Sequence, residues 1–236
     1  MKKIKAILLA AGFGTRLRPI TLETPKCLVD VNKKPLLEHW LVKLEKLGCT
    51  EVLINTHYLN EKVENFIANY DSKKISIKIV YEPIILGTAG TLINNLEFFK
   101  DSIGLLIHAD NFTNESLFGF IDAHIKRPKD CLLSMLTFTT KNPSSCGIIK
   151  KDQFGRVLNF YEKSNEFHGD CANGAIYAFD KSFIMELKKF PKKTSDFSLE
   201  VLPAMIGKIY SWHTNCSYID VGTPESLQRA NLLAKS

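Results

Sequence analysis

The residues best suited to chemistry form a short segment near the N-terminus. Small residues in this segment would let backbone N–H groups approach phosphate oxygens closely. Arg16 and Lys26 add the positive charge that a triphosphate requires. The segment therefore has the composition of a phosphate-binding loop, and it reads Leu9-Ala10-Ala11-Gly12-Phe13-Gly14-Thr15-Arg16-Leu17-Arg18-Pro19, then Thr24-Pro25-Lys26.

Two familiar phosphate loops do not match this segment. The chain has no G-x-x-x-x-G-K-[ST] sequence, which excludes a P-loop. Gly12 and Gly14 lack the third glycine of the dinucleotide fingerprint, and no suitable acidic residue follows, so a Rossmann oxidoreductase is not expected. A bare Gly-x-Gly pair is also compatible with a tight turn.

Two aspartates are candidates for a metal site. Asp110 follows a buried apolar run that ends at His108, and Asp220 precedes Val221-Gly222-Thr223-Pro224. Mg²⁺ prefers hard oxygen ligands and usually takes one or two carboxylates, together with phosphates and waters. The alternative is that each aspartate caps a helix or a turn. Asp110 in particular could cap the turn into a helix over 116–124.

Two further clusters are polar enough to bind a ligand. Glu82-Pro83 leads into Gly87-Thr88-Ala89-Gly90, which is typical of a loop before a helix. Glu162-Lys163 by itself is typical of a surface ion pair, and Asn173-Gly174 of a hairpin turn. We expect structural roles for the other reactive side chains. A packing or capping role is favoured for His57, His108 and His124, and a contact from His57 or Tyr58 to the base or sugar stays open. The Cys27 thiol has no histidine partner in view.

The apolar pattern predicts the elements that position these residues. The first half alternates strand and helix, which predicts an α/β fold with a Rossmann-like, mostly parallel sheet flanked by helices on both faces. Ligands bind such sheets outside the C-terminal strand ends, so the loops after Ala10 and His108 should lie on one rim. No repeat or linker interrupts the pattern, so we expect a single domain over 1–236. Predicted strands cover 4–10, 51–55, 75–81, 102–108, 131–139, 147–151, 157–162, 175–180, 209–213 and 216–220, and predicted helices cover 35–47, 60–70, 90–99, 116–124, 181–190, 199–207 and 224–234.

The composition and charge indicate which class of protein and which cell compartment to expect. The chain has 236 residues, of which 45% are hydrophobic, so a large core is expected. The net charge of +6 comes from scattered lysines, which does not favour nucleic-acid binding. The six cysteines are widely spaced without a C-x-x-C pair, which favours reduced thiols in the cytoplasm over a zinc site. The apolar start is too short for a signal peptide, and no run is long enough for a membrane span.

The complete phosphate-loop string is similar to the activation loop of the sugar-1-phosphate nucleotidylyltransferases. It resembles their short, single-domain form, which includes mannose- or heptose-1-phosphate guanylyltransferases and N-acetylmuramate-1-phosphate uridylyltransferase. Asp110 resembles the family's metal aspartate, although Ala109 replaces the usual glycine, and Asp220 matches an Asp-x-Gly-Thr-Pro stretch. Ser164 follows the Glu-Lys pair where the family usually has proline. The resemblance extends from Lys5 to about Ala230.

The resemblance implies a part for each candidate. Arg16 would hold the β- and γ-phosphates and stabilise the departing pyrophosphate, and Lys26 would contact the α-phosphate or the sugar phosphate. Asp110 and Asp220 would bind Mg²⁺. The nucleotide would contact Leu9, Ala10, Ala11, Gly12, Gly14, Thr15, Glu82, Gly87 and Thr88, and the sugar phosphate would contact Gly147, Glu162, Lys163 and Asn173.

The implied reaction transfers a nucleoside monophosphate from an NTP to a sugar 1-phosphate by direct displacement, with GTP and a mannose- or heptose-type sugar favoured. Three alternatives stay open: a uridylyltransferase for another sugar, a cytidylyltransferase for a small phosphorylated metabolite, and a non-catalytic subunit that binds nucleotide sugars. The expected partners are the NTP and the sugar 1-phosphate, without nucleic acid or membrane. Homo-oligomers are left open.

Overall fold

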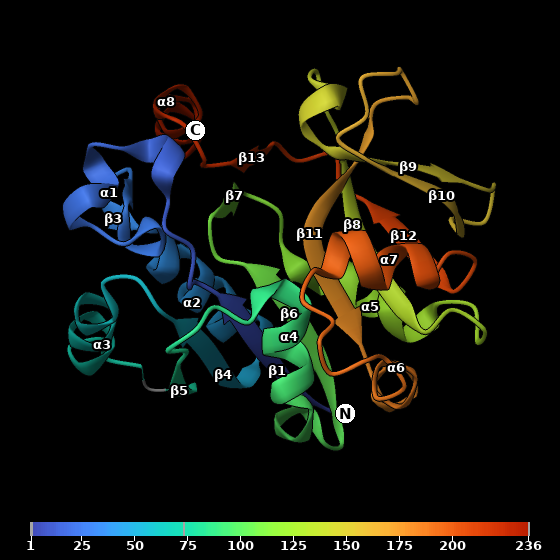
Figure 1. The fold of residues 1–236 in the computed structure, drawn as a ribbon, viewed down its shortest axis with the longest axis horizontal. Helices are drawn as coiled ribbons and strands as arrows, with labels where there is room; N and C mark the ends of the chain where they lie inside the picture. The colour runs from blue at the N-terminus through green and yellow to red at the C-terminus, as the bar shows by residue number, and fades with distance from the viewer. Residues whose placement is uncertain (1, 73, 236) are drawn as a thin grey trace. The chain divides into compact units, whose positions relative to one another are not determined.

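The protein folds into two compact units, whose segments alternate along the chain (Figure 1). The computed structural model describes residues 2–72 and 74–235, so both ends of the predicted domain over 1–236 lie outside the described residues. The glycine-loop unit comprises Lys3–Ile85, Ile107–Glu115 and Ser217–Ser236. The antiparallel unit comprises Met1–Lys2, Leu86–Leu106 and Ser116–Cys216. Each unit therefore brings together segments that are far apart in the sequence.

Three parallel strands form the framework of the glycine-loop unit. They are β1 (Lys3–Leu9), β4 (Cys49–Thr56) and β5 (Ser76–Tyr81), with β4 paired to both neighbours. The apolar centres of β1 and β4 are fully buried, as expected for parallel strands covered on both faces. Leu9 pairs with Asn55, and Asn55 pairs with Val80, so the carboxyl ends of the three strands are aligned.

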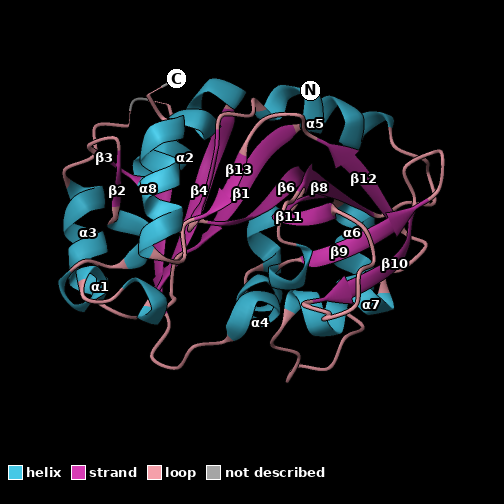
Figure 2. Ribbon diagram, turned by 90° about the horizontal axis from the view of Figure 1, so that it is seen from above, coloured by secondary structure: helices cyan, strands magenta, loops and turns pink. Residues whose placement is uncertain are grey.

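Two helices connect these strands. In α2 (Leu36–Leu47) the apolar side chains predicted from helical spacing are buried, and Gly48 ends the helix in the left-handed conformation with φ 81°. The second helix, α3 (Asn60–Ala68), follows β4 and buries only Val63 completely. Figure 2 shows both helices beside the strands of their unit. The predicted strand–helix alternation in this region is confirmed.

Short elements complete the glycine-loop unit. The segment after β1 contains a 3-10 helix η1 (Thr15–Leu17), a single turn α1 (Ile20–Glu23) and a 3-10 helix η2 (Lys26–Leu28). A two-stranded ladder joins β7 (Asn111–Thr113) to β13 (Tyr218–Asp220), and another joins β2 (Asp30–Val31) to β3 (Lys34–Pro35). The final helix α8 (Pro224–Leu233) begins with a capping box at Thr223 and Ser226.

The antiparallel unit is built around β8 (Leu133–Thr139) and β11 (Cys171–Phe179), which pair antiparallel. Strand β9 (Gly147–Lys151) pairs with β11 and with β10 (Val157–Glu162), and β12 (Ile209–His213) runs parallel to β8. Strand β6 (Ser102–His108) carries the chain from this unit into the glycine-loop unit. The remaining elements are α4 (Gly87–Asn94), η3 (Leu96–Phe99), α5 (Leu117–Lys126), α6 (Lys181–Leu187), the π-helix η5 (Phe197–Val201) and α7 (Leu202–Ala204).

Three expectations about local structure were wrong. Gly87 to Gly90 form the first turn of α4 and are not a loop, because the backbone N–H of Ala89 finds an acceptor in Ser195 O at 2.9 Å. Asn173 and Gly174 lie inside β11 rather than in a hairpin turn. The predicted helix over 199–207 divides into a π-turn and a short α-turn. No helix in the described ranges is long and apolar enough to cross a membrane.

Candidate active site

The two candidate metal aspartates come together through the ladder between β7 and β13. Asp220, the last residue of β13, pairs with Asn111, the first residue of β7. The backbone N–H of Val221 donates to the carbonyl oxygen of Asp110 over 3.0 Å. The ladder thus places side chains about 110 positions apart in the sequence at one site. Asp110 does not cap α5, whose N-cap residue is Ser116.

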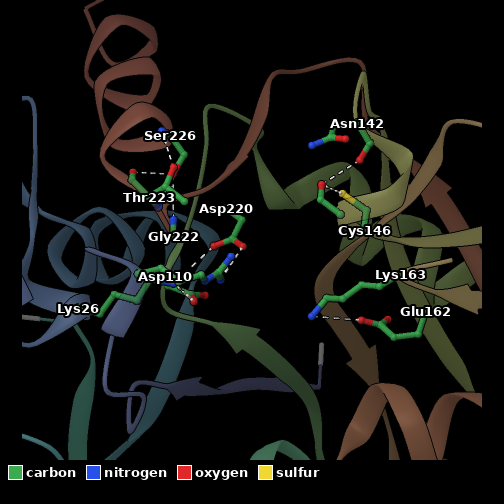
Figure 3. A network of polar contacts seen from close by, with 12 residues as sticks. Lys26, Asp110, Asn142, Cys146, Glu162, Lys163, Asp220, Gly222, Thr223 and Ser226 are labelled. Carbon is green, nitrogen blue, oxygen red and sulfur yellow. Dashed lines mark hydrogen bonds and ion pairs between the residues drawn. The ribbon is translucent and has the colours of Figure 1, made fainter. Parts of the chain in front are cut away.

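Lys26 lies between the two carboxylates (Figure 3). Its ammonium group donates to Asp110 Oδ2 and lies 3.5 Å from Asp220 Oδ1. Burial raises the pKa of Asp110, but the positive charges of Lys26 and His108 and the hydrogen bond from Lys26 outweigh this effect. The pKa of Asp110 therefore lies below its ordinary value, and the carboxylate is held ionised.

Arg16 approaches the same site from η1. Its Nη2 atom lies 3.6 Å from Asp220 Oδ2, while 67% of its side chain is exposed. Exposed ion pairs contribute little to stability, so this guanidinium can exchange its partner for a ligand anion at small cost. Gly222 leaves room for the contact, since a Cβ atom there would lie only 2.9 Å from Arg16 Nη2.

Glycine is required at one position of the phosphate loop by both conformation and space. Gly14 has φ 63°, and a Cβ atom would lie 2.9 Å from Thr21 Cγ2 and 3.2 Å from Lys26 Cβ. The Thr21 hydroxyl donates to Gly14 O over 2.7 Å, which fixes the turn next to Lys26. Gly12 has open space where a Cβ atom would be, so a ligand can approach its backbone.

The remaining nucleotide candidates of this unit lie at the strand ends. Leu9 ends β1, Ala10 and Ala11 follow it as buried residues, and Thr15 begins η1. Glu82 follows β5, and its side chain is only 2% exposed. Its carboxylate accepts a hydrogen bond from Asn55 Nδ2 over 3.1 Å, and Asn55 Oδ1 accepts from Ala10 N–H over 2.8 Å.

Sequence reasoning did not select Asn55 as a site residue. The available signal was an amide that interrupts the buried apolar run of β4, because a buried polar side chain needs hydrogen-bond partners. Gly222 was also missed, although it lies within the stretch that identified Asp220. Its importance depends on the approach of Arg16, which no local pattern reveals.

In the antiparallel unit, Gly147 and Glu162 are paired residues of β9 and β10. A Cβ atom at Gly147 would lie 2.7 Å from Glu162 Oε2, so glycine leaves room for the carboxylate. Burial and the negative charge of Asp196 raise the pKa of Glu162 above its ordinary value. Lys163 partly opposes this shift from 3.8 Å, but its side chain is 68% exposed.

Asn173 has its amide orientation fixed within the same unit. Its Nδ2 atom donates to the Tyr177 hydroxyl over 2.7 Å, and its Oδ1 atom accepts from Ala175 N–H over 2.9 Å. The pairing of β11 with β8 is irregular between Asn173 and Tyr177, and Ala175 has φ 50°. This bulge re-aims the strand locally, as bulges beside binding sites commonly do.

Gly87 and Thr88 have structural contacts in the antiparallel unit. Gly87 has φ 78°, and a Cβ atom would lie 2.3 Å from Ser195 O, so no larger residue fits. The Thr88 hydroxyl oxygen accepts from Phe197 N–H over 2.8 Å. Both residues therefore fix the start of α4 against the segment that leads into η5.

The donor set of the glycine-loop unit fits a hard divalent cation. Asp110 and Asp220 both reach one ammonium nitrogen, so they lie close enough to share a positive charge. In the described ranges, no group of three or more His, Cys, Asp or Glu side chains forms a complete metal cage. Mg²⁺ commonly takes only one or two protein carboxylates and completes its shell with phosphates and waters.

Cys27 next to Lys26 is not suited to be a nucleophile. Burial raises the pKa of its thiol to about 12, so the thiolate is scarce at neutral pH. The cysteines of the described chain are free rather than paired in disulfides.

Comparison with known proteins identifies the family of the chain. The family described as nucleotidyl transferase matches residues 5–236. The chain is 31% identical over 227 residues to "Mannose-1-phosphate guanylyltransferase catalytic subunit beta" of Dictyostelium discoideum, covering 94% of this chain and 62% of the relative. It is also 31% identical over 230 residues to "Mannose-1-phosphate guanyltransferase" of Neurospora crassa, with the same two coverages. The chain thus spans about three fifths of the length of these relatives.

Solved structures share the fold. A putative glucose-1-phosphate thymidylyltransferase from Bacillus anthracis, in complex with a sucrose, matches with a TM-score of 0.88 at 23% identity, over 99% of this chain and 96% of that chain. HddC from Yersinia pseudotuberculosis, complexed with GMP-PN, matches with a TM-score of 0.80 at 24% identity, over 97% and 98%. The predicted α/β fold class, a mostly parallel sheet flanked by helices, is confirmed. With a family match that covers nearly all of its length, the chain belongs to the nucleotidyl transferase family.

Proposed function

We propose that the protein transfers a nucleoside monophosphate from an NTP to a sugar 1-phosphate and releases pyrophosphate. GTP and a mannose- or heptose-type sugar phosphate are the favoured pair, since the named relatives are mannose-1-phosphate guanylyltransferases. The observation that carries the proposal is the convergence of Lys26, Arg16 and two aspartates beside the glycine loop. Such a cluster suits a reaction in which two anions must meet.

The reaction is a direct displacement. An oxygen of the sugar phosphate forms a bond to the α-phosphorus of the NTP, and the bond from that phosphorus to the bridging oxygen of pyrophosphate breaks. Lys26 neutralises charge at the α-phosphate or the sugar phosphate, and Arg16 stabilises the departing pyrophosphate. The glycine loop contributes backbone N–H groups, and no covalent enzyme intermediate is needed.

Mg²⁺ is the proposed cofactor, held by the carboxylates of Asp110 and Asp220. When bound, it would supply positive charge that offsets the repulsion between phosphate groups. Lys26 already contacts both carboxylates. We therefore propose that its ammonium group moves to a phosphate oxygen when ligands bind, and that bound Mg²⁺ would replace the positive charge that keeps Asp110 ionised.

The sugar is assigned to Glu162 and Asn173, with Gly147 and Lys163 as further contacts. A carboxylate accepts hydrogen bonds from neighbouring sugar hydroxyls, and the Asn173 amide is already oriented by its own hydrogen bonds. We further propose a cytoplasmic location, which suits six free cysteines. The whole chain is proposed to act as one nucleotidylyltransferase domain.

A matrix assay tests the function. Each of four NTPs is incubated with Mg²⁺ and with mannose, heptose, glucose and N-acetylmuramate 1-phosphates, and pyrophosphate release is measured. The highest kcat/KM is expected for GTP with mannose or heptose 1-phosphate. Release with none of the pairs, combined with binding of a nucleotide sugar, would instead support a non-catalytic binding subunit. A preference for CTP with a phosphorylated alcohol would support the cytidylyltransferase alternative.

A further inference from the structure

A buried hydrogen-bond relay connects the carboxyl ends of three parallel strands below the glycine loop. Ala10 follows β1, Asn55 lies in β4, and Glu82 follows β5. The Ala10 N–H donates to Asn55 Oδ1 over 2.8 Å, and Asn55 Nδ2 donates to Glu82 Oε1 over 3.1 Å. The side chains of Asn55 and Glu82 are 3% and 2% exposed, so the relay is shielded from water.

The relay has a fixed direction. The carboxyl oxygen Oε1 of Glu82 accepts from the amide nitrogen of Asn55. The amide oxygen of Asn55 is then directed at the Ala10 N–H, which can only donate. Reversing the amide would set oxygen against oxygen at Glu82 and leave a backbone donor facing an amide NH₂ group, a costly arrangement in a buried site.

Glu82 is itself held at both ends of its backbone. Its N–H donates to Thr56 O over 2.8 Å, and its carbonyl oxygen accepts from His57 Nδ1 over 2.7 Å. Since a carbonyl oxygen cannot donate, His57 carries its proton on Nδ1. The carboxylate therefore starts from a rigid backbone, and the direction of the relay is set by the sheet.

The relay ends where the phosphate loop begins. Leu9 O accepts from Ala109 N–H over 3.1 Å, which ties the same strand end to the residue before Asp110. Ala10 and Ala11 are 8% and 6% exposed, whereas Gly12 has open space beside it. The placement of the backbone that approaches a ligand at Gly12 thus depends on the peptide fixed at Ala10.

We propose that Asn55 and Glu82 are positioning residues that set the glycine-loop backbone for nucleotide binding, an inference that rests on the proposed function. Glu82 is too deeply buried to serve chiefly as a ligand contact. It acts through Asn55 and Ala10, and its effect falls on the NTP rather than on the sugar phosphate. The position of the glycine loop depends on which group of the relay donates and which accepts each hydrogen bond, and not on the size of the side chains.

Exchanging the amide of Asn55 and the carboxylate of Glu82 tests this direction of the hydrogen bonds. Asn55→Asp places two carboxylates face to face, and we expect NTP affinity to fall roughly ten- to a hundredfold, as for a disrupted buried hydrogen bond. Glu82→Gln removes the charge but can still accept, so a fall of about threefold is expected. In the double variant the glutamine amide donates to the new carboxylate, which accepts from Ala10 N–H. NTP affinity should then recover to within about threefold of wild type.

Three readouts separate positioning from general stability. NTP binding is measured by calorimetry with Mg²⁺ and without sugar phosphate, KM is measured for each substrate, and amide hydrogen exchange is followed at Ala10. We expect faster exchange and weaker NTP binding in Asn55→Asp, restoration of both in the double variant, and an unchanged KM for the sugar phosphate. Asn69→Asp, an exposed position at the end of α3, is the matched control and should change none of these values.

The outcomes are decisive in each direction. A double variant no better than Asn55→Asp, or equal shifts in the KM values of both substrates, overturns the positioning role. If the double variant does not fold, Glu82→Gln alone decides, because an unchanged NTP affinity contradicts the relay. Absence of pyrophosphate release by the wild-type protein would overturn the proposed function itself, whereas turnover without rescue overturns only the relay.

Discussion

The two units treat their carboxylates in opposite ways. In the glycine-loop unit, Asp110 is paired with Lys26, and its pKa is lowered despite burial. In the antiparallel unit, Glu162 is half-buried beside Asp196, and the Lys163 ammonium group, 3.8 Å away, is mostly solvated. The first carboxylate is held charged by a cation, whereas the pKa of the second is raised.

This difference matches the chemistry proposed for each unit. Phosphate groups and a divalent cation require fixed charges of both signs, which attract strongly where water is partly excluded. A sugar is neutral at its hydroxyls and requires oriented hydrogen bonds instead. The comparison therefore predicts that charge removal in the glycine-loop unit affects turnover, while removal in the antiparallel unit affects sugar affinity.

The largest expected effect is at Arg16. Arg16→Ala should lower kcat by roughly 10²–10³, the range for losing one preorganised electrostatic contact in the transition state. Steady-state pyrophosphate release measures the change. Arg229→Ala on the exposed face of α8 serves as a control for loss of one arginine from the same unit. If the activity of Arg16→Ala stayed within threefold of wild type, the expectation that charges in the glycine-loop unit control turnover would be wrong.

The second prediction concerns His124, a buried polar residue with a purely structural role. His124 Nε2 lies 3.2 Å from Arg127 Nη1, and its Nδ1 lies 2.8 Å from Ser134 Oγ. Burial, followed by the charge of Arg127, lowers the pKa of His124 from 6.5 to about 3, against opposition from Asp180; Lys2 adds to the lowering. The neutral ring accepts from Arg127, so protonation would break this contact.

A histidine pKa lowered by folding makes stability pH-dependent with a defined sign. The unfolded chain binds more protons between about pH 3 and 6.5, so the contribution is complete above pH 6.5 and is lost as pH falls. Between pH 7 and pH 5 we expect His124 to account for a loss of about 2 kcal/mol in unfolding free energy. Urea unfolding of His124→Gln should show a correspondingly flatter pH dependence, and an identical slope would contradict a neutral buried ring.

The third prediction tests the sugar side. Glu162→Gln should raise KM for the sugar phosphate roughly tenfold, because a charge-assisted hydrogen bond is replaced by a weaker one. KM for the NTP and the melting temperature should remain near wild type. Glu166→Gln is a matched control, since 86% of the Glu166 side chain is exposed. A larger change in kcat than in sugar KM would show that Glu162 acts in turnover, contrary to the comparison.

The smallest effect is expected at Gly222. In Gly222→Ala the added methyl group would lie 2.9 Å from Arg16 Nη2 and 3.2 Å from Asp220 Oδ1. Both neighbours are the ends of flexible side chains, so they can move aside with little loss of stability. We expect kcat to fall roughly fivefold with an unchanged melting temperature, as for a modest displacement of catalytic groups. A lower melting temperature with normal kcat would show that Gly222 has a structural role instead.

Long periodic elements could be read from the sequence. The buried run of β1 and the helical spacing of α2 each satisfy a local pattern, and Gly48 ends α2 as expected. In the ladder of β7 and β13, the strand β7 was not predicted, because it has only three residues and its partner lies about a hundred positions away. Non-local pairing of so short a strand leaves no periodic signal.

Within the site, the sequence identified the charged groups but not the polar groups that support them. Arg16, Lys26, Asp110 and Asp220 were all selected, and the structure brings these four together. The Asn55 relay was not selected, and Gly87 with Thr88 was assigned to a loop rather than to the first turn of α4. A buried amide and a glycine against a backbone carbonyl are recognised only when their neighbours are known.

Residue type and local spacing were enough to identify a glycine-rich loop with two cations and carboxylates at strand ends, because they set charge and backbone freedom. Which of these charges meet depends on the fold of the whole unit. Lys26 reaches both aspartates because the β7–β13 ladder aligns Asp220 beside Asp110. That alignment depends on hydrogen bonds between distant segments, whose partners are chosen by the packing of the whole unit rather than by either segment alone.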